Sequence, residues 1–93
     1  MRLNEAERQA VVQVVRAADP DAVVYLFGSR ANDKAKGGDI DLLVLSDKID
    51  VMAKLDILGR LHAMLGEQRI DLVVFPDQEK PFARLAVREG CRL

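Results

Sequence analysis

Two aspartates lie two positions apart at the start of an apolar run, in the segment GGDIDLLVL of residues 37–45. Burying unpaired carboxylates is costly, so Asp39 and Asp41 are unexpected at the start of a purely structural strand. Side chains alternate along a strand, which places both carboxylates on one face, about 6.6 Å apart. The alternative is a purely structural role, in which the two carboxylates are solvated at the strand end or capped by a nearby lysine.

A third aspartate begins a similar segment further along the chain. DLVVF (71–75) repeats the pattern of DLLVL (41–45), and the connection between them holds one predicted helix, enough for a right-handed crossover between parallel strands. Parallel strands align their starts, so we expect Asp71 beside Asp39 and Asp41. Three converging carboxylates stay ionised most readily around a divalent cation, and two Mg²⁺ ions can clamp the oxygens of a phosphoryl-type displacement. Taken alone, Asp71 can also be a surface residue that starts a strand.

A glycine–serine turn precedes the aspartate pair. If the strand that ends at Gly28 runs antiparallel to the Asp39–Asp41 strand, Gly28 and Ser29 reach the same end of the sheet. Glycine allows the backbone to approach a phosphate closely, and the serine hydroxyl and nearby N–H groups can donate hydrogen bonds to it. Arg30 adds a donor-rich positive charge, which makes it a candidate nucleotide-binding residue. The lysines at 34 and 36 are more simply solvated loop charges.

Three helices and three strands are expected to position these residues. Hydrophobic spacing predicts helices over about 3–18, 47–66 and 81–89, and apolar runs predict strands at 22–28, 39–46 and 69–75. Asn4 and Glu7 are typical of a capping box, and Asp19 with Pro20 ends the first helix. The prediction is a single α/β domain of residues 1–93, with a small mixed β-sheet and flanking helices.

Composition excludes several classes of protein. The chain is 49% hydrophobic and 31% charged, which is typical of a compact globular domain. A formal net charge of −1 argues against general nucleic-acid binding, and one cysteine with one histidine argues against a disulfide framework or a structural zinc site. We find no membrane span or signal peptide and expect a cytoplasmic protein. A domain of this size buries only about 60–65% of its unfolded surface, so a partner or homo-oligomer would help it.

The combined motif resembles a known enzyme family. FGSRANDKAKGGDIDLLVL (27–45), followed by RIDLVVF (69–75), is similar to the minimal nucleotidyltransferases of the DNA polymerase β-like superfamily. The resemblance implies a polymerase β-like core and Mg²⁺-dependent transfer of a nucleoside monophosphate, typically AMP from ATP, with release of pyrophosphate. It assigns Gly28 and Ser29 to the phosphate-binding turn, and Asp39, Asp41 and Asp71 to catalysis and metal binding. Gly38 replaces the usual serine, and the nine residues between Ser29 and Asp39 are one fewer than is common.

The resemblance also suggests a partner. Larger relatives carry a second domain for the acceptor, for which this chain has no room, and stand-alone members are commonly paired with an all-helical HEPN-type protein. In several such pairs the helical protein is a toxin, and the nucleotidyltransferase is an antitoxin that adenylylates it. Two alternatives stay open: a binding module with a vestigial site, and a nucleotidyltransferase that modifies a small molecule. We expect exposed apolar surface for a partner or second copy on helix 81–89 and on the first helix.

Overall fold

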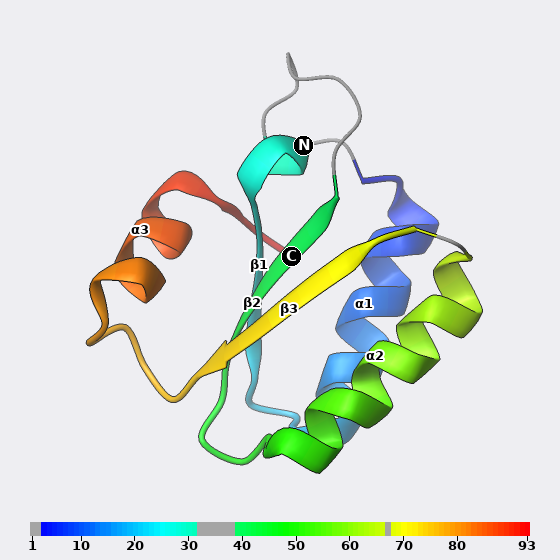
Figure 1. Cartoon of the computed structure of the whole chain (residues 1–93), viewed down its shortest axis with the longest axis horizontal. Helices are drawn as coiled ribbons and strands as arrows, with labels where there is room; N and C mark the ends of the chain where they lie inside the picture. The colour runs from blue at the N-terminus through cyan, green and yellow to red at the C-terminus, as the bar shows by residue number, and fades with distance from the viewer. Residues whose placement is uncertain (1–2, 32–38, 67) are drawn as a thin grey trace.

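A four-stranded sheet separates two helices on one side from a third helix on the other (Figure 1). The computed structural model describes residues 3–31, 39–66 and 68–93. In chain order the elements are α1 (Glu5–Ala18), β1 (Val23–Phe27), the 3₁₀ turn η1 (Gly28–Ala31), β2 (Ile40–Leu45), α2 (Val51–Leu65), β3 (Ile70–Phe75), α3 (Pro81–Glu89) and β4 (Cys91–Arg92). The predicted α/β class with a small mixed sheet is therefore confirmed.

The strand order in the sheet is β3-β2-β1-β4. β1 pairs antiparallel with β2, and β2 pairs parallel with β3, as the two Asp-initiated segments predict. The short strand β4, which pairs antiparallel with β1, was not predicted. It follows Gly90, where an added Cβ would lie 2.6 Å from the carbonyl oxygen of Leu26, so glycine allows the end of α3 to approach β1 closely.

Local signals explain where the helices begin. Asn4 and Glu7 form the predicted capping box at the start of α1. α2 begins at Val51, later than predicted, because the Asp50 side chain accepts a hydrogen bond from the Ala53 N–H and caps the helix there. Hydrophobic spacing predicts one apolar stripe on this helix, made of Val51, Leu55, Leu58, Leu61, His62 and Leu65. Val51 and Leu55 are instead 72% and 57% exposed, and Ile57 and Leu61 are the buried residues.

The two faces of the sheet are covered unequally. Ile40, Leu42 and Val44 of β2 belong to the main hydrophobic core, which also includes residues of α1 and α2. Alternation places the odd-numbered side chains of β2 on the opposite face, where α3 lies (Figure 1). There, Phe82 of α3 contacts Phe27 of β1 and Phe75 of β3. α3 packs on this face through Phe82, and the aspartates lie at its other end, toward the starts of β2 and β3.

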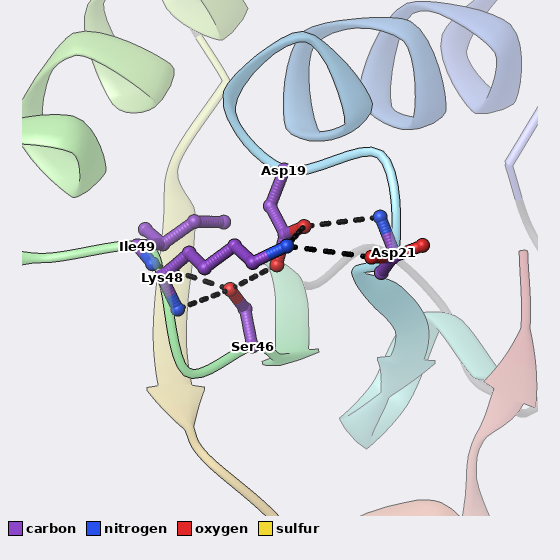
Figure 2. Close-up of polar contacts among 5 residues, drawn as sticks. All are labelled: Asp19, Asp21, Ser46, Lys48 and Ile49. Atoms are coloured by element: carbon purple, nitrogen blue, oxygen red, sulfur yellow. Dashed lines mark hydrogen bonds and ion pairs between the residues drawn. The ribbon is translucent and has the colours of Figure 1, made fainter.

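A polar network joins the end of α1 to the end of β2 (Figure 2). The Ser46 hydroxyl donates to Asp19 Oδ2 at 2.5 Å and accepts from the backbone N–H groups of Lys48 and Ile49. Asp19, which is only 2% exposed, also accepts from the Asp21 N–H. The Lys48 ammonium group forms ion pairs with the carboxylates of Asp19 and Asp21. This network fixes the end of the sheet opposite the aspartates of β2 and β3.

The expected apolar surfaces are present in part. On α3, Phe82 and Leu85 are 46% and 48% exposed, as predicted. The prediction for the first helix is wrong, because the apolar residues of α1 pack into the core, where Val11 and Val15 are fully buried. Within the described residues, none of the helices has the length and apolar character needed to cross a membrane.

Candidate active site

The paired starts of β2 and β3 bring the predicted carboxylates together. In the parallel ladder Asp41 lies directly beside Asp71, and the Ile40 N–H donates to the Arg69 carbonyl at 2.9 Å. Asp39 immediately precedes β2 and has the same strand parity as Asp41, so both side chains lie on the face of the sheet that carries α3. Asp39 and Asp71 are 44% and 50% exposed. The three acids therefore share one accessible end of one face.

The glycine–serine turn reaches the same place from β1. Phe27 is the register partner of Asp41, so the next residue, Gly28, begins η1 directly beside that aspartate. Gly28 has φ of +73°, a left-handed conformation that favours glycine. A Cβ added at Gly28 would collide with the Asp41 carboxylate. Glycine is thus required both for the turn and for its contact with the acid, and Ser29 follows it within η1.

The acids act on one another electrostatically. Burial raises the pKa of the Asp41 carboxyl, and the charge of Asp71 and a hydrogen bond between the two carboxyl groups raise it further. The charge of Asp39 acts in the same direction, whereas the Arg69 guanidinium opposes it. The environment of Asp41 is therefore electronegative and favours binding of a cation.

Arg69 is a site residue that the sequence reasoning missed. Its Nε lies 3.5 Å from Asp39 Oδ2 and 3.9 Å from Asp71 Oδ1, so the guanidinium lies between two of the three acids. Alternation along the extended chain could have found it, because Arg69 is two positions before Asp71 and shares its face.

The structure places the Arg30 side chain against the segment between α2 and β3. Its guanidinium donates to Gln68 Oε1 at 3.0 Å, and the Gln68 amide donates in turn to Glu7 and to the Leu65 carbonyl. Gln68, also unforeseen, therefore links η1 to α1 and α2 next to Arg69. The predictions for the lysines at 34 and 36 and for the glycine at 38 lie outside the described residues.

The donor set fits a hard divalent cation in chemistry. Asp39, Asp41 and Asp71 offer only carboxylate oxygens, which suit Mg²⁺ together with water and substrate phosphates. Within residues 3–31, 39–66 and 68–93, no three acidic, histidine or cysteine side chains are already arranged to hold an ion. The Asp71 carboxyl already lies beside that of Asp41, and Asp39 is exposed enough for side-chain rotation to bring its oxygens toward them. The backbone thus supplies the placement, and rotamer changes would complete the coordination.

The sequence matches a known protein family. The family described as "Polymerase beta, Nucleotidyltransferase" matches residues 9–93, which is nearly the whole chain and includes Asp39, Asp41 and Asp71. No similar protein was found among curated proteins.

Several solved structures share the fold. Two are crystal structures of the toxin–antitoxin MntA-HpeT. A chain of the first, in which a tyrosine is replaced by alanine, is 25% identical over 92% of this chain and 69% of its own, with a TM-score of 0.70. A chain of the second, in which two aspartates are replaced by glutamate, is 24% identical over 97% and 72%, with a TM-score of 0.73. A third, assigned as a nucleotidyltransferase, is 23% identical over 95% and 98%, with a TM-score of 0.67.

Proposed function

The chain belongs to the polymerase β nucleotidyltransferase family, and we propose that it transfers AMP from ATP to a hydroxyl group of a partner protein. The observation that carries this proposal is the placement of Asp39, Asp41 and Asp71 on one accessible face, directly beside the turn at Gly28. Acids at this end of the sheet can bind metal ions, and a glycine turn beside them can bind the phosphates of a nucleoside triphosphate.

Each group has a chemical role in this proposal. Asp39, Asp41 and Asp71 would hold Mg²⁺, which when bound neutralises charge on the triphosphate and clamps the reacting oxygens. The turn from Gly28 to Ser29 would hold phosphate oxygens through backbone N–H groups. The acceptor oxygen bonds to the α-phosphorus, and the bond from that phosphorus to the bridging oxygen of the β-phosphate breaks. Pyrophosphate leaves, and the hydroxyl proton passes to a site carboxylate.

The acceptor is proposed to be a separate protein. A chain in the toxin–antitoxin MntA-HpeT is 25% identical to this one, which supports a role as the antitoxin member of such a pair. We propose an all-helical HEPN-type partner that docks over the end of the sheet near Gly28 and presents a tyrosine or serine. In-line attack tolerates little misplacement, so the hydroxyl must come within contact distance of the α-phosphate.

The test uses the full chain and the protein encoded beside it. The two are mixed with ATP and Mg²⁺, and mass spectrometry of both is expected to find added AMP on a hydroxyl residue of the partner. Asp39→Asn is the matched inactive variant, because it keeps side-chain shape and removes a metal-binding charge. A tight complex that never carries nucleotide would support the binding-module reading instead. Consumption of ATP only when a small-molecule alcohol is added would support the small-molecule acceptor.

A further inference from the structure

Arg69 is built into the acidic face by the same ladder that places the aspartates. Its carbonyl accepts the Ile40 N–H at 2.9 Å, which holds residue 69 level with Asp39 at the start of the parallel pair. Strand alternation then directs the Arg69 side chain to the face that carries Asp71. The result is a group of four residues on one face. Asp39 lies level with Arg69, and Asp41 is paired with Asp71 at the next position on that face.

The contacts of Arg69 differ from those of the helix-surface arginines. Arg8 and Arg60 pair with acids one turn away on their own helices. Arg69 instead lies within 4 Å of two acids, one that precedes β2 and one on β3. Its Nε lies next to carboxylate oxygens of Asp39 and Asp71, and a bound cation would need the same oxygens. The side chain is also 74% exposed, so it can leave these acids without breaking a packed contact.

We propose that Arg69 is an internal counter-cation that competes with a divalent ion for Asp39 and Asp71 and moves to the nucleotide phosphates when the ion binds. This inference rests on the proposed function, because it takes the acids to be metal ligands. Guanidinium groups bind phosphate oxygens in a bidentate manner, and Arg69 lies beside the acids that would hold the phosphate-binding cation. The competition weakens binding of the metal alone and favours binding of the metal together with a triphosphate.

The first experiment measures Mn²⁺ binding by electron paramagnetic resonance, in the absence of nucleotide and at neutral pH. Arg69→Gln is expected to bind Mn²⁺ about tenfold more tightly than the wild type, because the variant no longer places a positive charge beside Asp39 and Asp71. Arg60→Gln is the matched control. It removes the same charge from an exposed ion pair with Asp56 on α2 and should leave Mn²⁺ affinity unchanged.

The same titration is repeated with a non-hydrolysable ATP analogue. The advantage of Arg69→Gln is expected to disappear or reverse, because the variant lacks the guanidinium that would contact the phosphates. Arg69→Lys keeps the charge but loses the planar fork. We therefore expect metal affinity close to that of the wild type and a loss of analogue affinity.

Thermal unfolding gives a readout that needs neither nucleotide nor activity. Without metal, Arg69→Gln should unfold at a lower temperature than the wild type, because three acids lose their counter-charge, and Mg²⁺ should raise its Tm by a larger increment. Equal Mn²⁺ affinity and equal Mg²⁺ increments in Arg69→Gln and the wild type would overturn the role of Arg69 and leave the proposed function standing. Absence of metal binding in every variant, even with the nucleotide analogue, would overturn both.

Discussion

Asp41 is the acid most enclosed by the candidate site, since it contacts the Gly28 turn on one side and Asp71 on the other. Its negative charge is unfavourable in this position, because burial and the neighbouring acids all raise its pKa. A residue that is electrostatically unfavourable without a ligand is expected to be retained for binding rather than for stability. This distinction can be measured.

We expect Asp41→Asn to separate activity from stability. Asparagine keeps the side-chain shape but removes the charge that would bind Mg²⁺, so nucleotide transfer should fall by orders of magnitude. The Tm without metal should hold or rise, because repulsion from Asp71 and Asp39 is relieved. Differential scanning calorimetry checks the expected Tm, and a transfer assay with labelled ATP checks the expected loss of activity. Near-normal transfer in an Asp39→Asn, Asp41→Asn double variant would show that the chemistry lies elsewhere.

Gly28→Ala tests the close approach between the turn and Asp41. The added Cβ collides with the Asp41 carboxylate, and the left-handed backbone of Gly28 costs a non-glycine residue about 1–2 kcal/mol. We therefore expect a lowered free energy of unfolding and loss of nucleotide transfer. Gly59→Ala is the control, because a Cβ at that helix position meets no atom within 4 Å, and stability there should hold or rise. Unchanged transfer in Gly28→Ala would argue against phosphate binding at this turn.

Among the secondary-structure elements, the junction between α1 and β2 depends on Asp19 (Figure 2). The Ser46 hydroxyl, with the Asp21 N–H and the charge of Lys48, holds the pKa of the Asp19 carboxyl below its usual range. A lowered native pKa means that Asp19 stabilises the fold above the unfolded-state pKa of about 3.9, and that this stabilisation is lost as the pH falls through the lower native value.

Asp19→Asn is accordingly expected to destabilise the protein in a pH-dependent manner. The loss of unfolding free energy should be largest near neutral pH. It should shrink once the pH falls below about 3.9, where the unfolded-state acid binds its proton, and disappear as the pH falls through the lower native pKa. Urea unfolding at pH 7, 5 and 3 measures it. Asp21→Asn is the control, because Asp21 is 85% exposed and should matter little at any of these pH values. A loss at Asp19 that is constant with pH would contradict this account.

Two residues of α3 with nearly equal exposure should respond differently to substitution. Phe82 contacts the rings of Phe27 at 5.6 Å and Phe75 at 6.0 Å between centroids, and such ring pairs contribute about 0.5–1.5 kcal/mol beyond area burial. Phe82→Ser should therefore cost at least about 1.5 kcal/mol of unfolding free energy, whereas Leu85→Ser should stay within about 0.5 kcal/mol. Chemical denaturation of both variants checks the difference. Equal losses would show that these ring contacts do not hold α3 to the sheet.

Much of this arrangement could be predicted from the sequence. The capping box of Asn4 and Glu7, the alternation around Asp39 and Asp41, and the repeated Asp-initiated strands are local signals with one structural outcome. β4 could not be predicted in this way, since a two-residue strand is defined only by its pairing with β1. The stripe of α2 was misread because the face that packs on the core is centred on Ile57 and Leu61, which leaves Val51 and Leu55 exposed.

The acidic site was predictable as a set of residues, but its electrostatic balance was not. Spacing alone indicated which acids converge. The contact of Arg69 with two of them depends on side-chain direction and on the register of two strands distant in sequence. The link from Arg30 through Gln68 to Glu7 likewise joins three separate segments. Such contacts follow from the folded arrangement and leave no local pattern.

At the scale of the whole molecule, exposed apolar side chains gather at the start of α2, away from the acidic site. Val51, Met52 and Leu55 are 72%, 73% and 57% exposed. α2 starts after the end of β2 and returns to the start of β3, so these residues lie at the far end of the sheet from Asp39 (Figure 1). Exposed apolar side chains of this size favour association.

Replacing Met52 and Leu55 with glutamine tests whether this surface supports a homo-oligomer. Because neither residue belongs to the core, the free energy of unfolding should change by less than about 0.5 kcal/mol for each. We expect concentration-dependent self-association, measured by analytical ultracentrifugation, to weaken. Nucleotide transfer should persist, since the acids are remote. An unchanged association state would show that these residues do not mediate self-association.

The short strand β4 gives the protein a built-in attachment point for a reporter. Cys91, the only cysteine in the sequence, is the register partner of Leu26, and its Sγ lies 4.0 Å from the carbonyl oxygen of Ala31 in η1. A thiol reagent must reach a half-buried sulfur between these elements, so its reaction rate depends on how closely β4 and η1 pack around it. Slower labelling of Cys91 in the presence of ATP would indicate that nucleotide binds at η1, and this test needs no engineered fluorophore.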